Sequence, residues 1–101
     1  MKEINDSNYY DFVKDGMSLL KIGSTWCQPC KTIEPIVEGL STEYTGIKFG
    51  KMDADQSPDT MTKLQIRSIP TIIIYKNGLV VDKHVGMASK KQLSDILDKH
   101  S

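Results

Sequence analysis

The chain has 101 residues, of which 39% are hydrophobic and 26% charged, and its 13 basic and 13 acidic side chains give a formal net charge of zero. This composition is typical of one globular domain spanning residues 1–101 and excludes a disordered chain. The balanced charge gives no reason to expect nucleic acid or an anionic membrane as a partner, and the longest apolar run, IIIY at 72–75, is too short to cross a bilayer.

Apolar periodicity and turn residues divide the chain into alternating strands and helices followed by a hairpin. In chain order the predicted elements are a strand at 2–5, a helix at 7–16, a strand at 18–24, a helix at 29–46, a strand at 47–54, a helix at 57–65, a hairpin at 71–85 and a helix at 89–100. The alternating first half implies parallel strands with right-handed crossovers, and the hairpin adds antiparallel ones. The sequence therefore predicts an α/β fold with a central mixed sheet of about five strands, flanked by four helices on both faces.

Three element ends have a local signal of their own. Ser7 and Ser57 each precede a helical pattern, so we expect their hydroxyls to cap the two helices. Asn77 and Gly78 lie between two apolar runs, and this dipeptide favours the tight turn of a two-residue hairpin.

Both cysteines of the chain lie in TWCQPCK at 25–31, between a predicted strand and a predicted helix. Two thiols at this spacing can serve as a structural disulfide, as half of a metal site or as a redox couple. A bridge between Cys27 and Cys30 closes a very short loop and therefore contributes little stability. A structural zinc site normally takes four protein ligands, and His84 and His100 lack the spacing of a ligand pair. No metal site is expected, and the redox couple is favoured.

The position of the two cysteines predicts different roles for them. In an open α/β sheet, active sites form where strands end and helices begin. Cys27 precedes the predicted helix, and the positive end of a helix stabilises a thiolate. Cys30 lies about one turn further along, where it can attack a mixed disulfide formed on Cys27. We therefore expect Cys27 to be the nucleophile and Cys30 the resolving thiol.

Several short motifs recur in order along the chain. They are WCQPCK at 26–31, Pro35, RSIPT at 67–71, NGLV at 77–80 and HVGM at 84–87. In this order and at this spacing, over essentially the whole chain, they resemble the thioredoxin family. The resemblance implies the thioredoxin fold and a monomeric thiol-disulfide oxidoreductase that reduces protein disulfides. We expect a cytoplasmic protein, because the N-terminal residues contain no apolar core of a signal peptide.

The resemblance also implies how such a protein is recharged and how it holds its substrate. No cofactor would be bound; the Cys27–Cys30 disulfide would receive electrons from NADPH through a separate thioredoxin reductase and pass them to oxidised client proteins. The peptide bond before Pro70 would be cis and face the cysteines, and the backbone before it would pair with an extended client strand. The implied substrate-binding rim consists of Trp26, Gln28, Pro29, Ile69, Pro70, Val85, Gly86 and Met87.

The chain departs from the family at Lys21, where the family has a buried acid six residues before the first cysteine. Lys51 matches a lysine that the family places beside that acid. Glu34 lies four residues after Cys30 and seven after Cys27, which puts all three on one helix face. We hypothesise that Glu34 replaces the missing acid, held by Lys21 or Lys51. The alternative is that the stem of Lys21 runs along apolar surface to water and that Glu34 is simply solvated.

Two alternatives to a thioredoxin-type reductase stay open. One is a glutathione-coupled, glutaredoxin-like reductase, against which the tryptophan before the motif argues mildly. The other is a binding module of the same fold, in which the rim holds a partner protein without catalysis. Unpaired cations beside the thiols would make the couple more oxidising, whereas a paired Lys21 predicts only a modest shift.

Overall fold

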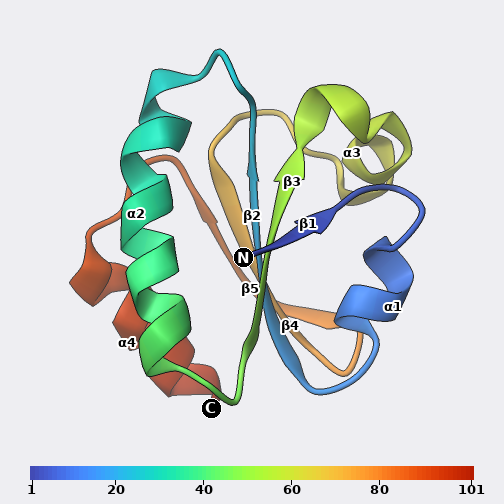
Figure 1. Cartoon of the computed structure of the whole chain (residues 1–101). Coiled ribbons are helices and arrows are strands. Elements are labelled where there is room, and N and C mark those ends of the chain that lie inside the picture. The colour runs from blue at the N-terminus through green and yellow to red at the C-terminus, as the bar shows by residue number, and fades with distance from the viewer.

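A mixed sheet of five strands forms the centre of the computed structural model, which describes residues 1–101. The strands are β1 (Lys2–Ile4), β2 (Met17–Gly23), β3 (Lys48–Asp53), β4 (Thr71–Lys76) and β5 (Leu79–Val85). They lie side by side in the order β1-β3-β2-β4-β5 (Figure 1). β3 pairs in parallel with both β1 and β2, whereas β4 runs antiparallel to β2 and β5. The predicted mixed α/β sheet is confirmed.

Four α-helices cover the two faces of this sheet. They are α1 (Tyr9–Val13), α2 (Gln28–Glu43), α3 (Pro58–Leu64) and α4 (Lys90–His100), and a 3-10 turn, η1 (Ala54–Gln56), precedes α3. Figure 1 shows α2 and α4 on one face and α1 and α3 on the other. No helix combines the length and the apolar character needed to span a bilayer.

Each face of the sheet carries its own apolar core, because successive side chains of a strand point to opposite faces. Leu19 of β2 packs with Ile33, Val37 and side chains of α4, whereas the next residue, Leu20, packs with Phe12 and the α1 face. Both leucines are fully buried. β2 is therefore covered on both sides, as a strand with apolar residues on both of its faces should be.

The prediction that Ser7 caps the first helix is wrong. Asn8 occupies the cap position of α1, and its side chain makes no cap hydrogen bond. The Oδ1 atom of Asn5 instead accepts hydrogen bonds from the backbone N–H of Ser7, at 2.9 Å, and from its hydroxyl, at 2.6 Å. Ser7 is therefore part of an Asx turn that leads into the helix.

The cap prediction for Ser57 is also wrong in its chemistry. Ser57 does occupy the cap position of α3, but its hydroxyl is buried without a hydrogen-bond partner. The carboxylate of Asp6 takes over the capping. It accepts hydrogen bonds from the backbone N–H groups of Thr60, at 2.9 Å, and Asp59, at 3.2 Å, and from the Thr60 hydroxyl, at 2.7 Å. A loop 50-odd positions away along the chain thus satisfies the free donors at the start of α3.

The predicted hairpin turn is confirmed at Asn77 and Gly78, whose φ angles are 52° and 83°. Both values lie in the left-handed region that a two-residue turn of this kind requires. The turn is also tied to the segment after α1. Asn77 N–H donates to the Gly16 carbonyl, and Gly16 N–H donates to Asn77 Oδ1, both at 2.8 Å.

Candidate active site

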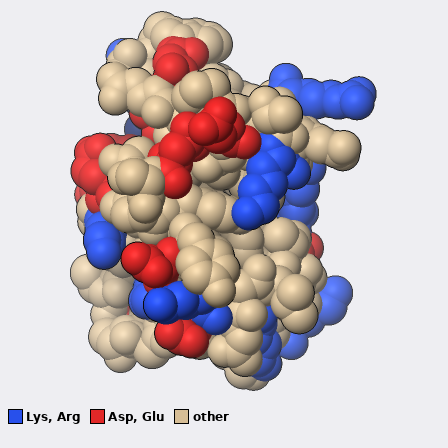
Figure 2. All heavy atoms as spheres, turned by 90° about the vertical axis from the view of Figure 1, so that its right-hand side faces the viewer, with Lys and Arg blue, Asp and Glu red and all other residues tan.

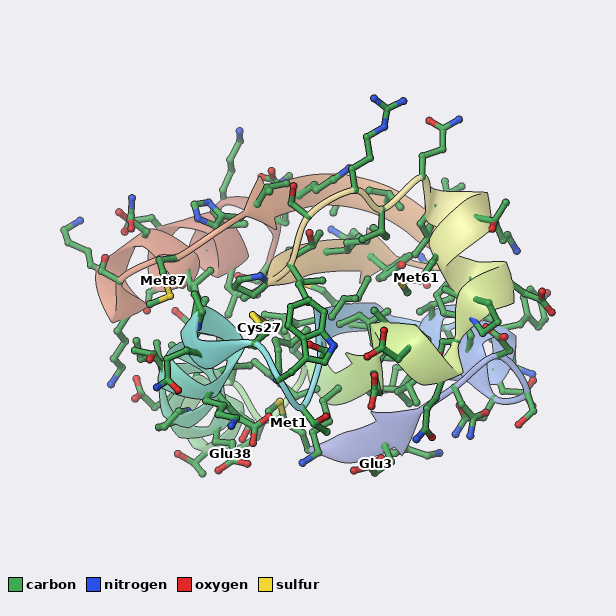
Figure 3. The ribbon with its side chains drawn as sticks, turned by 90° about the horizontal axis from the view of Figure 1, so that it is seen from above. Met1, Glu3, Cys27, Glu38, Met61 and Met87 are labelled. Carbon is green, nitrogen blue, oxygen red and sulfur yellow. A yellow bond between two sulfur atoms is a disulfide. The ribbon has the colours of Figure 1, made fainter.

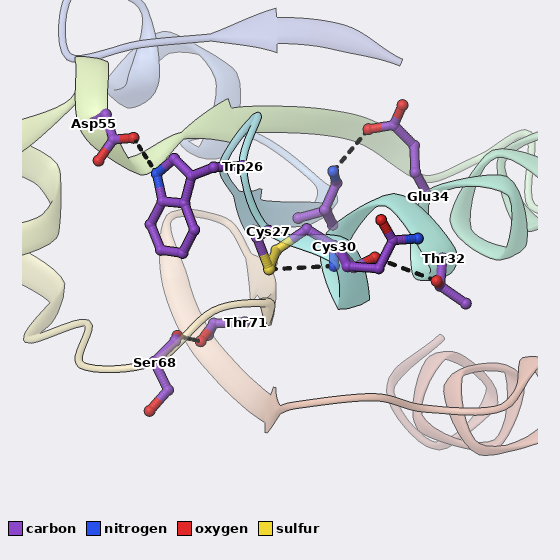
Figure 4. Close-up of a disulfide and its surroundings, with 10 residues drawn as sticks. Trp26, Cys27, Cys30, Thr32, Glu34, Asp55, Ser68 and Thr71 are labelled. Atoms are coloured by element: carbon purple, nitrogen blue, oxygen red, sulfur yellow. Dashed lines mark hydrogen bonds and ion pairs between the residues drawn. A yellow bond between two sulfur atoms is a disulfide. The ribbon is translucent and has the colours of Figure 1, made fainter.

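The two cysteines form a disulfide at the N-terminal end of α2, with their Cα atoms 5.3 Å apart (Figure 4). Cys27 is the cap residue of the helix, and its sulfur accepts a hydrogen bond from the backbone N–H of Cys30 at 3.3 Å. Pro29 lies in the first turn, where its missing N–H leaves no helix bond unmade. Cys27 is 5% exposed and Cys30 1%. The cysteine at the positive end of the helix is thus the one that a substrate reaches first.

A loop with a cis peptide bond between Ile69 and Pro70 leads into β4. This geometry is the one implied for Pro70 by the sequence motif. The Pro70 carbonyl accepts a hydrogen bond from Gly86 N–H at 2.8 Å, which joins this loop to the end of β5. The Thr71 hydroxyl donates to the carbonyl of Ser68 at 2.5 Å and closes the loop on itself. Figure 4 shows Ser68 and Thr71 on the opposite side of the disulfide from Glu34.

Several residues of the predicted rim expose apolar side chains. Trp26 is 68% exposed, Val85 52% and Met87 46%. Gln28 and Pro29 are also exposed, whereas Ile69 is partly buried and Pro70 buried. Figure 3 looks down on this end of the molecule and shows Cys27 near its centre and Met87 toward one side. Exposed apolar groups around a reactive sulfur fit a surface that contacts other proteins.

Two residues that fix the rim were not found by the sequence analysis. Asp55, in η1, accepts a hydrogen bond from Nε1 of the exposed Trp26 at 2.8 Å and so holds the indole in place (Figure 4). The Nε2 atom of His84 lies 2.8 Å from the carbonyl oxygen of Met87, across the turn in which Gly86 has a φ of 91°. The sequence places His84 in the HVGM motif but gives it no structural role, and Asp55 has no local sequence signal.

Lys21 and Glu34 form an ion pair behind the disulfide, with Lys21 Nζ 2.7 Å from Glu34 Oε1 (Figure 4). The lysine side chain is 7% exposed and the glutamate side chain 34%. Lys51 Nζ lies 3.9 Å from Glu34 Oε2. The hydrogen bond from Lys21 is the main cause that lowers the pKa of Glu34; desolvation, the next largest effect, opposes it, and the charges of Lys21 and Lys51 lower the pKa further. Glu34 is therefore held as a carboxylate.

Gly23 brings the buried lysine close to the buried sulfur. A β carbon at Gly23 would lie 3.0 Å from the sulfur of Cys30 and 3.6 Å from Lys21 Nζ, so the two atoms border the same glycine. A pocket of about 460 Å³ opens beside them and is lined by Cys30, Lys21, Glu34 and Lys51, among others. The pocket thus borders both the sulfur of Cys30 and the ion pair. No three His, Cys, Asp or Glu side chains are grouped as metal ligands would be.

The family model described as Thioredoxin matches residues 1–99. The chain belongs to the thioredoxin family. It is 40% identical over 99 residues to a thioredoxin of Staphylococcus saprophyticus, with 97% of this chain and 95% of that protein covered. A thioredoxin of Staphylococcus haemolyticus is 41% identical, with the same coverage.

A solved structure confirms the thioredoxin fold. One of its chains superposes with a TM-score of 0.89 at 25% identity and covers 98% of this chain and 94% of its own length. That structure concerns the thiol-resolving mechanism of a yeast mitochondrial 1-Cys peroxiredoxin through glutathione and thioredoxin systems.

Membership of the thioredoxin family, together with the disulfide at the helix end, makes the protein a thiol-disulfide oxidoreductase. Its working group is the Cys27–Cys30 pair, and the family typically needs no prosthetic group. In general terms, its partners are a reductase and client proteins. Lys21 occupies the position at which the resemblance to the family implies a buried acid, and in the structure it forms an ion pair with Glu34.

Proposed function

We propose that the protein is a thioredoxin-type protein-disulfide reductase that works as a cytoplasmic monomer. It takes electrons from NADPH through a separate thioredoxin reductase and passes them to oxidised client proteins. The observation that carries this proposal is the disulfide at the start of α2, with a slightly exposed Cys27 and a nearly inaccessible Cys30. Such an arrangement gives one attacking and one resolving thiol.

The reaction consists of two successive thiolate attacks. The Cys27 thiolate attacks one sulfur of the client disulfide; the client S–S bond breaks, and a bond between Cys27 and the client forms. The released client thiolate takes up a proton. Cys30 then loses its proton and attacks the sulfur of Cys27, which releases the second client thiolate, and this thiolate takes up a proton in turn. The client has gained two electrons and two protons, and the protein is left as its Cys27–Cys30 disulfide.

The client is held as an extended strand against the Pro70 loop. The backbone N–H and carbonyl of Ile69 form no hydrogen bond within the chain. The carbonyls of its two neighbours, Ser68 and Pro70, each accept one. These free groups support pairing with the backbone of a client strand, as in the addition of a strand to a sheet edge. Trp26, Val85 and Met87 would then cover the client's apolar side chains.

The ion pair is proposed to assist the second attack. The hypothesis that Glu34 accepts the Cys30 proton requires Glu34 to be held by Lys21 or Lys51, and both lysines do approach it. A carboxylate with a lowered pKa is, however, a weak proton acceptor. We therefore favour a division of roles in which Lys21 stabilises the Cys30 thiolate and Glu34 holds Lys21 in place.

A coupled assay tests the proposed function. NADPH oxidation is followed with thioredoxin reductase and a protein disulfide, and in parallel with glutathione and glutathione reductase. We expect turnover only with thioredoxin reductase, its loss in Cys27→Ser, and a trapped mixed disulfide in Cys30→Ser. Turnover with glutathione alone would instead support the glutaredoxin-like alternative, and a biological function that survives serine at both positions would support a binding module.

The roles of the ion pair are separated by the pH profile of mixed-disulfide resolution. If Lys21 stabilises the thiolate, Lys21→Met moves the half-maximal rate to higher pH and lowers the reduction potential, while Glu34→Gln has the smaller effect on both. If Glu34 accepts the proton, Glu34→Gln slows resolution across the pH range and Lys21→Met leaves the profile in place. The potential of the unaltered protein, measured in glutathione buffers, is expected near the value of about −270 mV that is typical of thioredoxin.

A further inference from the structure

A second pocket, of about 360 Å³, lies between the end of α3, the Pro70 loop and β5. Ser68 and Thr71, which flank the Ile69–Pro70 peptide, contribute to its wall, as does the exposed Val85 of the rim. The pocket therefore adjoins the place where the proposed function puts the client strand. A side chain of that strand can enter the pocket, because alternate residues of an extended strand point to the same side.

The charges in this pocket are all positive. Arg67 and Lys83 line it, and no Asp or Glu does. Both cations are exposed, and neither belongs to any ion pair of the chain. Asp82 precedes Lys83, but its carboxylate points to the other face of β5, where His100 Nε2 lies 2.9 Å away. We call Arg67, Lys83 and the pocket between them the cationic subsite.

Four carboxylates lie on the other side of the disulfide. The pocket behind the disulfide is lined by Glu3, Glu34, Glu38 and Asp53. Figure 2, which faces α1 and α3, shows Lys and Arg along the right-hand side of this face and Asp and Glu at its upper centre, with charges of both signs at its left edge and lower centre. The chain is neutral as a whole, so any preference for a charged client has to come from this local separation rather than from net charge.

We propose that the cationic subsite selects client proteins with an acidic side chain beside the disulfide that is reduced. This inference rests on the proposed function, which brings the client strand to the Pro70 loop. The client carboxylate lies between the guanidinium of Arg67 and the ammonium of Lys83. It thereby holds the strand in register while Cys27 attacks the client sulfur. No bond forms or breaks in the subsite, which acts on binding alone.

Disulfide peptides that differ in one side chain test the proposal. A series carries Glu, Gln or Lys at each flanking position in turn, and kcat/KM is measured with thioredoxin reductase and NADPH. At one position we expect Glu to exceed Gln and Gln to exceed Lys, by about two- to fivefold per step, as for partly exposed ion pairs. The ratio should fall as salt is added, because exposed charges are screened.

Charge reversal at the subsite provides the decisive comparison. Arg67→Glu and Lys83→Glu should each reduce or invert the preference. Lys2→Glu makes the same change of charge on β1, at the opposite edge of the sheet, and should leave the preference as it was. A small neutral dialkyl disulfide should be reduced at one rate by all four proteins, which shows that the cysteines work in each.

The outcomes separate the subsite from the proposed function. Reduction of all peptides at equal rates, or a Lys2→Glu effect as large as that of Arg67→Glu, would overturn the subsite alone. Oxidised glutathione reduced as fast as the best acidic peptide would also overturn it, since the subsite would then serve a small anionic disulfide. If not even the neutral disulfide is reduced, the proposed function fails, and the subsite with it.

Discussion

The ammonium of Lys21 and the carboxylate of Glu34 are 2.7 Å apart but stand in different environments, with 7% of the lysine side chain exposed and 34% of the glutamate side chain. The pair is therefore asymmetric. Glu34 keeps contact with solvent and with Lys51 when Lys21 is removed. Lys21 has no other ion-pair partner when Glu34 is removed.

This asymmetry predicts that Glu34→Gln is more destabilising than Lys21→Met. Loss of the carboxylate leaves a buried cation with only a neutral acceptor, which we expect to cost about 1–3 kcal/mol of unfolding free energy. Replacement of the lysine by an apolar side chain of similar length should be close to neutral. Urea denaturation of both variants and of the double variant measures the difference. A greater loss from Lys21→Met than from Glu34→Gln would contradict the burial of the pair.

Asp6 predicts a specific acid dependence of stability. Its pKa is lowered, chiefly by the hydrogen bond from the Thr60 hydroxyl and further by the backbone N–H groups of Thr60 and Asp59. A carboxyl whose pKa is lowered on folding stabilises the fold above its unfolded pKa, about 4, and this contribution disappears as the pH falls through the folded pKa.

Asp6→Ala should therefore lower the melting temperature at neutral pH, and this deficit should shrink below about pH 4. Thermal unfolding from neutral to acid pH measures it. Asp15→Ala serves as the control. Asp15 is an exposed acid that, like Asp6, lies in the connection between β1 and β2, and it takes part in no side-chain hydrogen bond or ion pair. A deficit that stays constant down to acid pH would show that Asp6 does not cap α3 as a carboxylate.

Two glycines should respond oppositely to alanine. A β carbon at Gly50, in β3, would lie 2.7 Å from Ile4 Cγ1 and 2.8 Å from Phe12 Cζ. Such overpacking should destabilise Gly50→Ala by about 1–3 kcal/mol. Gly39, inside α2, has no atom within 4 Å of the corresponding position other than those of its chain neighbours and the backbone of its own helix. Gly39→Ala should stabilise by about 0.5–1 kcal/mol through helix propensity. Denaturant midpoints that move in the same direction for both would refute this.

The buried pair of Tyr9 and Tyr75 predicts an alkaline limit of stability. The Tyr9 hydroxyl donates to the Tyr75 hydroxyl at 2.9 Å, and burial is the main cause that raises the pKa of both. A phenol whose pKa is raised on folding stabilises the fold below its unfolded pKa, about 10, and this stability is lost as the pH rises above it.

The tyrosinate absorbance should therefore show Tyr75 ionising only as the chain unfolds, and Tyr9 ionising at a higher pH than an exposed phenol. Tyr75→Phe leaves the Tyr9 hydroxyl without its partner and should cost about 1–3 kcal/mol at neutral pH. The double variant with Phe at both positions should lose less stability than the unaltered protein as the pH rises through the ordinary phenol pKa of about 10. An unchanged alkaline decline in the double variant would assign it to other groups.

The parts of the fold that could be predicted have signals within a few residues. Asn77 and Gly78 tolerate the positive φ angles of a tight turn, and the structure has them there. The predicted start of the last helix at Ser89 is also confirmed, since Ser89 and Gln92 form a reciprocal capping box. These features depend on local chemistry, which a sequence pattern records directly.

The features that the sequence analysis missed depend on residues far apart along the chain. Ser57 is the expected residue type at its cap, but Asp6 supplies the hydrogen bonds because β1 and β3 bring the two loops together. Asp55 reaches Trp26 across 29 positions for a similar reason. The Lys21–Glu34 pair is an exception, because a buried lysine needs a counter-ion and the spacing on the helix offered one.

β2, which leads to the disulfide, is hydrogen-bonded on both sides, to β3 and to β4. The turn with Gly86 and Met87, by contrast, follows β5, which is an outer strand. Amide hydrogen exchange should therefore be slowest in β2 and faster toward the end of β5. The strand that positions the reacting sulfur atoms is thus the most firmly held part of the sheet, and the edge next to the proposed client site is the part that opens most easily.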